Sequence, residues 1–494
     1  MNRPQTLGEL RASGWRSKSV KDELRDNLIE RLRRGEPAFP GIIGFDRTVI
    51  PQVQNALLSK HDFILLGLRG QAKTRILRSL AELLDDQIPA IEGCPIHDDP
   101  YAPISASSVR RAAEMGDDLP IEWLPREARY HEKLATPDVT IADLIGDVDP
   151  IKAANQRLDL SDPEVLHYGL LPRSHRGIFA VNELPDLAGR IQVGLLGILE
   201  EGDIQIRGFP LRLKLDVLAV FSANPEDYTN RGNIITPLRD RIASQILTHY
   251  PRTRDEGMAI TNQEAWQERP CEVRVELPDY LRLMIEEVAF QARDNEFVDQ
   301  ASGVSARMTI SLLENVISNA ERRALKCGAT HTVARTSDLY ASTASISGKI
   351  ELVYDGEREG VETISRILVG KAAAAVFATR FPDVYGEAGS GQGSAATNPF
   401  APVTEWFQGG RSLDLLGDTS DEELYAQLKT VPGLEEVTRK FLEPADDSHC
   451  AAGMELVLEA LHQGSLLAKE ELPEGRTYRD MLAEMAESLE SKRR

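Results

Sequence analysis

The sequence predicts an α/β fold, in which a parallel sheet is covered by helices on both faces, followed by a helical second part. Three short apolar runs indicate the sheet: DFILLG at 62–67, GIFAV at 177–181 and DVLAVFSA at 216–223. Runs that are apolar throughout are typical of strands covered on both faces. Beyond about residue 255 these runs fade, and stretches of helical periodicity such as RMTISLLENVISNAERRAL dominate. We therefore expect an α/β core over 37–250 and a helical domain over 251–387.

Length and charge narrow the class of protein. The chain has 494 residues, a size that predicts two or three domains. Its net charge of -21 disfavours binding to the phosphate backbone of nucleic acids. No run approaches the roughly 20 apolar residues of a membrane helix, and the polar N-terminus does not resemble an export signal. The expected location is cytoplasmic, with no membrane partner.

The cysteines and histidines indicate neither a zinc site nor a hydrolytic triad. The four cysteines lie far apart, without CxxC spacing or a nearby histidine pattern, and they are Cys94, Cys271, Cys327 and Cys450. No HExxH pair occurs. We expect all four thiols to be reduced and structural.

Helical segments are expected on both sides of the two main domains. Residues 1–36 contain an amphipathic helix over 19–34, with Ser19 as its N-cap and Asp22 at the third helical position. Residues 388–399, AGSGQGSAATNP, have the composition of a flexible linker. The acidic residues 400–494 are expected to form a small helical module. Its predicted elements are a capping box at Ser420 and a final helix over TYRDMLAEMAESLESKRR.

The sharpest motif joins the first predicted strand to a helix. It approximates G-x-x-x-x-G-K-[ST], and its residues are Gly67, Gly70, Gln71, Ala72, Lys73 and Thr74. A loop of this kind directs backbone N–H groups at a phosphate chain, while the lysine reaches the outer phosphates and the hydroxyl of Thr74 holds Mg²⁺. Ala72 replaces the second glycine of the motif. The alternative is an ordinary glycine-containing loop after a buried strand.

The second apolar strand ends in Asn182 and Glu183, where a nucleotide site of this kind needs acidic residues. The amide oxygen of Asn182 can accept a hydrogen bond from a water bound to Mg²⁺, although it brings no charge. Glu183 is the candidate to polarise the attacking water. The alternative for Glu183 is an exposed carboxylate at the end of a strand.

Three further polar residues complete the predicted site. Asn224 follows the third apolar strand, where its amide could bridge the γ-phosphate and the attacking water. Arg239 and Arg241 in TPLRDRI are candidates for an arginine finger that reaches the γ-phosphate of a neighbouring subunit, and surface ion pairing is the competing role. Arg307, at the start of a helix in the second domain, could close over the nucleotide.

In this order, the motifs resemble the AAA+ ATPases, and in detail the ATPase (I) subunit of magnesium chelatase and its MoxR-like relatives. The segments that carry the resemblance are PGIIGFDRTVIPQVQNAL, EGCPIHDDP, ATPDVTIADLIGDVDPIKAA, HYGLLPRSHRGIFAVNE, EGDIQIRGFPLRLKLDVLAVFSANPED, PLRDRI and SARMTI. They cover about residues 37–350. Within them, PLRDRI corresponds to a motif whose last arginine is the finger, which favours Arg241, and SARMTI places Arg307 at the sensor-2 position.

The resemblance implies a three-layer P-loop AAA+ core with a parallel sheet, an all-helical lid and ATP with Mg²⁺ as cofactors. It also implies an ATP-hydrolysing homo-oligomeric ring, with a hexamer expected, that remodels or activates a protein partner bearing a von Willebrand A domain. Ala72 and Asn182 depart from the family pattern and make slow hydrolysis an expectation. The C-terminal extension is a third departure and implies a different client. Two alternatives stay open: the ATPase subunit of a true magnesium chelatase, and an ATP-binding scaffold with little turnover.

Overall fold

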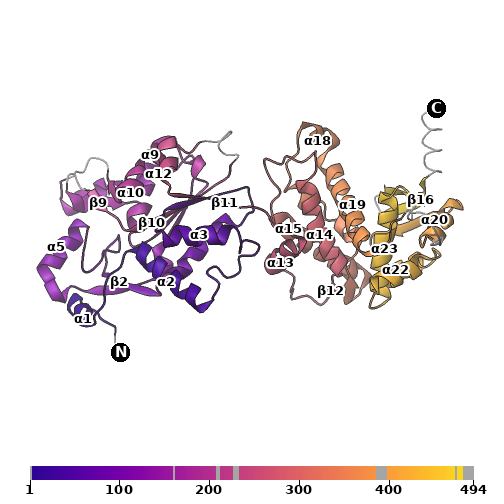
Figure 1. Ribbon diagram of the computed structural model, residues 1–494, viewed down its shortest axis with the longest axis horizontal. Coiled ribbons are helices and arrows are strands. Elements are labelled where there is room, and N and C mark those ends of the chain that lie inside the picture. Colours follow the sequence, from indigo (N-terminus) through magenta and orange to yellow (C-terminus); the bar gives the residue numbers. More distant parts are fainter. Residues whose placement is uncertain are drawn as a thin grey trace. The chain divides into compact units, whose positions relative to one another are not determined.

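The computed structural model describes residues 3–159, 162–206, 212–225, 233–384, 398–472 and 475–481. The chain divides into two compact units, Met1–Tyr250 and Pro251–Arg494, and each is described by itself (Figure 1). Among the described residues no helix combines the length and apolar character needed to cross a membrane. All four cysteines are free, as predicted.

A five-stranded parallel sheet forms the centre of the first unit, in the order β11-β1-β10-β7-β4. Its strands are β1 (Phe63–Leu66), β4 (Tyr130–Leu134), β7 (Gly177–Asn182), β10 (Val217–Ala223) and β11 (Ser244–Leu247). The three apolar runs of the sequence are β1, β7 and β10, which confirms their prediction as strands. Every residue of β7 and β10 is buried, because helices cover both faces of the sheet.

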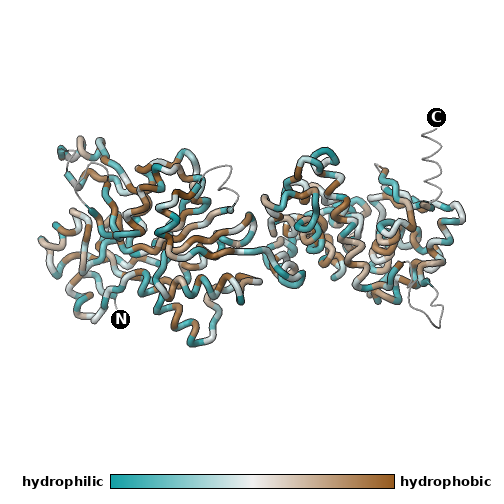
Figure 2. The backbone as a smooth tube through the Cα atoms, turned by 45° about the horizontal axis from the view of Figure 1, so that its top comes forward, coloured by the Kyte–Doolittle hydropathy of each residue, from teal (hydrophilic) through white to brown (hydrophobic). Residues whose placement is uncertain are grey.

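Alternate residues of each strand enter two different hydrophobic clusters, one on each face of the sheet. In β7, for example, Phe179 joins one cluster and Ala180 joins the other. On the Ala180 face lie α2 (Val20–Arg34), α3 (Val49–Leu58) and α4 (Lys73–Ser79). On the Phe179 face lie α9 (Gly189–Gly194), α10 (Leu196–Glu200) and α12 (Thr236–Arg241). Figure 1 shows the two groups of helices on opposite sides of the strands, and the strands are largely brown in Figure 2. The predicted three-layer core is confirmed.

The remaining elements of the first unit surround this core. The helices are α1 (Leu7–Ala12), α5 (Ala106–Met115), α6 (Ile141–Leu144), α7 (Pro150–Gln156) and α8 (Leu170–Arg173). Three antiparallel pairs join β2 (Gln87–Ile91) to β3 (Ile121–Pro125), β5 (Gly146–Val148) to β6 (Leu166–Tyr168), and β8 (Asp203–Gln205) to β9 (Arg212–Lys214).

Helix α2 begins as predicted, because the Ser19 side chain accepts a hydrogen bond from the backbone N–H of Asp22. A buried ion pair anchors the helix, since the guanidinium of Arg129 donates to both carboxylate oxygens of Glu23 at 2.7 and 2.6 Å. The N-terminal helical segment is therefore fixed to the core by charge as well as by its apolar face.

The second unit is mainly helical. Its helices are α13 (Arg254–Glu264), α14 (Asp279–Arg293), α15 (Arg307–Cys327), α16 (Thr336–Tyr340), α17 (Ala344–Ser347), α18 (Tyr354–Glu359), α19 (Val361–Arg380), α20 (Ala401–Gln408), α21 (Asp421–Leu428), α22 (Leu434–Leu442) and α23 (Asp447–Gln463). The capping box at Ser420 is confirmed at the start of α21. Most of the predicted linker lies outside the described residues.

Two small groups of strands in this unit differ from the all-helical prediction. A short parallel pair joins β12 (Arg274–Glu276) to β13 (His331–Val333). An antiparallel sheet, in the order β14-β16-β15, contains β14 (Leu413–Leu416), β15 (Leu467–Leu472) and β16 (Gly475–Asp480). The prediction of a helix beginning at TYRD was wrong. Those residues belong to β16, where Tyr478 is buried and both neighbouring strands supply hydrogen-bond partners that a local pattern does not reveal. Residues 482–494 of that predicted helix lie outside the described part of the chain.

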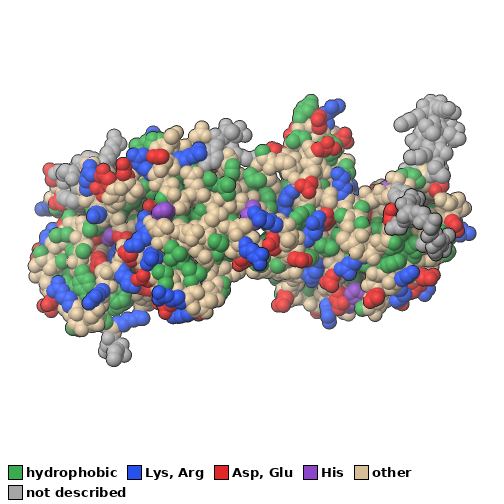
Figure 3. Space-filling view, viewed as in Figure 1, with side chains coloured by type: hydrophobic (Ala, Val, Ile, Leu, Met, Phe, Trp, Pro, Cys, Tyr) green, Lys and Arg blue, Asp and Glu red, His purple; other side chains and the backbone are tan. Residues whose placement is uncertain are grey.

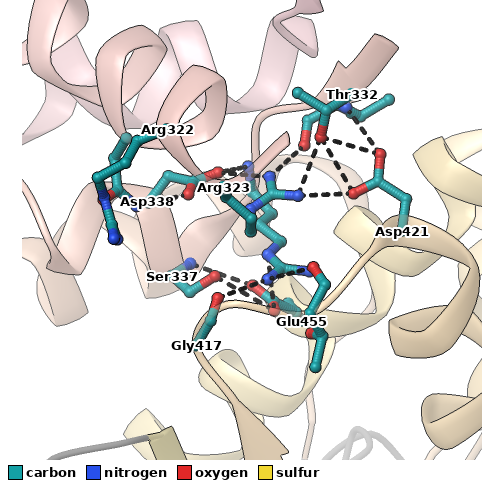
Figure 4. A network of polar contacts seen from close by, with 12 residues as sticks. Arg322, Arg323, Thr332, Ser337, Asp338, Gly417, Asp421 and Glu455 are labelled. Atoms are coloured by element: carbon teal, nitrogen blue, oxygen red, sulfur yellow. Dashed lines mark hydrogen bonds and ion pairs between the residues drawn. The ribbon is translucent and has the colours of Figure 1, made fainter. Parts of the chain in front are cut away.

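Residues on both sides of the predicted linker share one hydrophobic core in the second unit. The cluster includes Leu312 of α15 and Leu456 of α23. A buried polar network crosses the same junction: Arg323 of α15 donates to Asp338 at 3.0 Å and to Asp421 of α21 at 2.7 Å (Figure 4). The predicted lid and C-terminal residues therefore pack together through apolar contacts and buried charge.

We predict that Asp421→Ala destabilises the second unit by about 3–5 kcal/mol, because it leaves the buried guanidinium of Arg323 short of a carboxylate. Asp418→Ala is the matched control. Asp418 pairs with the adjacent Arg322, but both side chains are exposed, so we expect a loss of about 0–1 kcal/mol. Denaturant unfolding monitored by circular dichroism measures both. Equal losses in the two variants would contradict this prediction.

Candidate nucleotide site

The predicted phosphate loop joins the end of β1 to the start of α4. Since β1 lies between β10 and β11, the loop stands at the carboxyl edge of the sheet with parallel strands on both sides. Gly70 and Ala72 both have left-handed backbone conformations, with φ of 75° and 55°. The loop therefore turns twice before the helix begins at Lys73.

Close packing at Gly67 fixes the start of the loop. A Cβ atom at this position would overlap the Thr248 hydroxyl and the Gln71 side-chain oxygen. These two groups bind each other, because Thr248 Oγ1 donates to Gln71 Oε1 at 2.6 Å. The Gln71 side chain is buried in this contact, so its role in the described structure is to hold the loop to the end of β11.

The Lys73 side chain folds into the loop. Its Nζ donates to the backbone oxygen of Leu68 at 2.9 Å and also to that of Gly67. Lys73 is only 7% exposed. An ammonium group held inside a glycine-containing loop fits the phosphate chain of a nucleotide. Thr74 follows on α4 and is half-buried, and its predicted contact with Mg²⁺ stays a prediction.

Asn182 is part of a hydrogen-bond chain that crosses three neighbouring strands. Its amide nitrogen donates to Glu132 Oε1 on β4 at 2.6 Å, and its amide oxygen accepts from the Ser222 hydroxyl on β10 at 2.9 Å. The backbone N–H of Glu183 donates to the same Ser222 oxygen at 3.4 Å. No local sequence pattern marks Glu132 or Ser222, so neither residue could be predicted as a neighbour of Asn182.

Glu183 has a left-handed backbone, with φ of 55° and ψ of 50°. This conformation is unfavourable for a residue with a Cβ atom and is often found where function fixes the backbone. The residue follows β7 at the same edge of the sheet as the loop, and it is half-buried. A partly buried carboxylate at this edge can polarise a water molecule.

Asn224 follows β10 and carries an unsatisfied group. Its side-chain oxygen Oδ1 is buried and has no hydrogen-bond partner among the described residues. Buried polar atoms are nearly always hydrogen-bonded, so an open acceptor in a predicted site fits a water or ligand hydroxyl. The predicted contact of Asn224 with an attacking water stays a prediction.

The three candidate arginines lie at exposed or half-exposed positions. Arg241 ends α12, and its Nε donates to Glu200 Oε2 at 2.8 Å, a hydrogen bond that raises the pKa of the guanidinium. Arg239 is exposed. Arg307 is the first residue of α15 in the second unit and is also exposed. The finger role of Arg241 and the lid role of Arg307 stay predictions.

The side chains that could bind Mg²⁺ are few in the part of the chain that the structure describes. Among the described residues, no three His, Cys, Asp or Glu side chains gather in a group that could hold a metal. Mg²⁺ commonly takes one or two protein oxygens and completes its shell with waters and substrate phosphates. The hydroxyl of Thr74 and the amide oxygen of Asn182 are oxygens of the type that Mg²⁺ takes, and their contact with a metal stays a prediction.

We predict that Ala72→Gly stabilises the first unit by about 1 kcal/mol, because glycine adopts the left-handed conformation without the Cβ penalty. The matched control is Ala113→Gly on the exposed face of α5, which should destabilise the same unit by about 1 kcal/mol. Thermal unfolding of the two variants measures whether each change raises or lowers stability. If Ala72→Gly lowered stability as much as Ala113→Gly, the backbone strain at Ala72 would be contradicted.

Comparisons with known proteins give one significant relative of known name. No family model matches the chain. The magnesium-chelatase subunit ChlI of the Chlamydomonas reinhardtii chloroplast is 25% identical over 258 residues, which are 50% of this chain and 57% of that protein. The chain thus matches little more than half the length of this relative.

Two solved structures also align with the chain. A complex of subunits BchI and BchD of magnesium chelatase aligns at 19% identity over 65% of this chain and 98% of the other, with a TM-score of 0.34. NtrX from Brucella abortus in complex with ATP aligns at 13% identity over 59% of this chain and 52% of the other, with a TM-score of 0.33. At these TM-scores neither adds to what the chain's own sheet and loop establish.

Proposed function

We propose that this chain is an AAA+ ATPase of the magnesium chelatase subunit I and MoxR-like type, and that it hydrolyses ATP to remodel or activate a protein partner. The observation that carries the proposal is the meeting of three groups at one sheet edge. Lys73 lies inside the loop after β1, Glu183 follows β7, and Asn224 follows β10 with an acceptor oxygen that has no partner in the described part of the chain. ATP hydrolysis needs these three kinds of group at one place.

Each residue has a proposed role in this reaction. Lys73 binds the outer phosphates, Thr74 holds Mg²⁺, and Asn182 binds the metal through water. Glu183 polarises the attacking water, and the Asn224 amide orients it toward the γ-phosphate. Mg²⁺, when bound, neutralises charge that develops on the phosphate oxygens. Arg307 closes over the nucleotide from the second unit.

We further propose a homo-oligomeric ring, with six subunits expected, in the cytoplasm. In such a ring Arg241 would leave Glu200 and reach the nucleotide of the neighbouring subunit. The proposed partner is a protein with a von Willebrand A domain. Basic and acidic side chains are interspersed over the face in Figure 3, a distribution that suits protein contacts better than nucleic acid.

Two other functions have specific support. The relative from Chlamydomonas favours a role as the ATPase subunit of a true magnesium chelatase. The strained Ala72 and the neutral Asn182 favour a nucleotide-binding scaffold with little turnover. Turnover in the wild-type chain that equals that of a Lys73→Ala variant, together with assembly that depends on ATP, would select the scaffold.

We predict that Glu183→Gln lowers the turnover number of ATP hydrolysis by about a hundredfold or more, because it removes the group that polarises water. ATP affinity should stay close to that of the wild type, since Gln keeps the size and polarity of the side chain. Phosphate release and calorimetric ATP binding measure the two quantities. Wild-type turnover in this variant would remove Glu183 from the mechanism.

A second prediction concerns the finger. Arg241→Ala should lower turnover about 10³-fold while each subunit still binds ATP, because an arginine finger stabilises charge only in the transition state. Mixing this variant with Lys73→Ala should restore part of the activity, since some interfaces then combine an intact Lys73 with an intact Arg241.

Arg239→Ala is the matched control, because this arginine lies two residues earlier on α12 and should be dispensable. Phosphate release from the separate and mixed variants is the measurement. No recovery on mixing, or full activity in Arg241→Ala, would contradict an interface shared between subunits.

A further inference from the structure

Glu132 belongs to none of the sequence motifs, but its side chain contacts Asn182, the residue that stands where the motif expects an acidic side chain. It is on β4, the strand that pairs with β7, and the register places Glu132 beside Ala180 and Leu134 beside Asn182. Because side chains alternate along a strand, Glu132 and Asn182 project from the same face as Ala180. That face is covered by α4, the helix that follows the phosphate loop.

The contact between Glu132 and Asn182 has only one chemically consistent orientation. A carboxylate can only accept, so the group 2.6 Å from Glu132 Oε1 must be the amide nitrogen of Asn182. An aspartate at position 182 would set a second carboxylate against Glu132, and two carboxylates at this distance do not both ionise readily. Neutral Asn182 and acidic Glu132 are therefore mutually compatible.

Helix α4 brings Glu132 close to the face that carries Thr74. Arg78 Nε and Nη2 donate to the two oxygens of Glu132 at 2.7 and 2.9 Å. Arg78 follows Thr74 by four residues, so both side chains lie on one face of α4. The Arg78 side chain is 64% exposed, whereas that of Glu132 is 20% exposed. The carboxylate is thus the more buried partner, and the arginine lies toward solvent.

Resting on the proposed function, we propose that Glu132 supplies the negative charge that Asn182 lacks, so that the acidic group supporting Mg²⁺ binding stands on β4 instead of at the end of β7. The hydrogen bond from the Asn182 amide to Glu132 couples the orientation of this amide to the position of the carboxylate. Glu132 is accordingly a positioning residue that orients Asn182 and places negative charge beside the face of α4 that carries Thr74 and Arg78. A purely structural role, bracing α4 through Arg78, is the competing explanation.

The test uses the full chain and measures the Mg²⁺ concentration for half-maximal binding of a fluorescent ATP analogue. Glu132→Gln keeps an oxygen that accepts from Asn182 and Arg78 but removes the charge. We expect it to raise this Mg²⁺ concentration about tenfold, the scale of changes next to metal ligands. The double variant Asn182→Asp with Glu132→Gln returns one carboxylate to the pair and should bring the value back near that of the wild type.

Glu30→Gln is the matched control, because it removes one carboxylate from an exposed pair with Arg34 on α2. It should leave the Mg²⁺ dependence unchanged. Unfolding midpoints are measured alongside, and if Glu132→Gln alone fails to fold, the double variant is compared directly with the single Asn182→Asp variant. The double variant should then require less Mg²⁺, because only the single variant sets two carboxylates against each other.

The outcomes separate this inference from the proposed function. If the wild type and Glu132→Gln required the same Mg²⁺ concentration for half-maximal binding, the role of Glu132 would be overturned, whereas the proposed function would stand. If Glu132→Gln raised the Mg²⁺ concentration for half-maximal binding and the double variant did not restore it, Glu132 would only brace α4 through Arg78. That result would also overturn the inference. If the wild-type chain bound no ATP analogue at any Mg²⁺ concentration, the proposed function would fail first.

Discussion

The parallel pairing of β1 between β10 and β11 is the constraint on which the site depends. Parallel strands end at the same edge, so residues that follow β1, β7 and β10 meet although more than a hundred positions separate Lys73 from Glu183 and Asn224. Apolar clusters on both faces hold the strands in register. The polar groups at the edge thus sit on a rigid base, which is what an electrostatic site requires.

The two departures from the phosphate-site pattern have different physical consequences. Ala72 adopts the left-handed backbone that glycine would adopt without strain, so the loop keeps its shape at an energetic cost. Asn182 removes a negative charge from this position without straining the backbone. Its hydrogen bonds to Glu132 and Ser222 fix the orientation of its amide. The left-handed turn at position 72 and the side-chain orientation at position 182 are therefore both defined despite the two departures.

The second unit, like the first, combines an apolar core with buried charge. Arg323 of α15 donates to Asp338 of α16 and to Asp421 of α21, and Glu455 accepts from Arg476 within the same core. Charges removed from water must be paired, so losing one partner of these contacts would weaken the packing between helices that precede and follow residues 385–397. The small sheet β14-β16-β15 closes the same core through Tyr478.

The sequence alone determined the three central strands, the phosphate loop and the start of α2, because each depends on residues that are neighbours in the chain. Glu132 could not be found in this way, since it becomes significant only beside Asn182, fifty positions further on. The same holds for β16, whose partners β14 and β15 lie on either side of it in space. Local composition encodes local backbone, whereas hydrogen bonds between distant strands form only when the tertiary structure brings their donors and acceptors together.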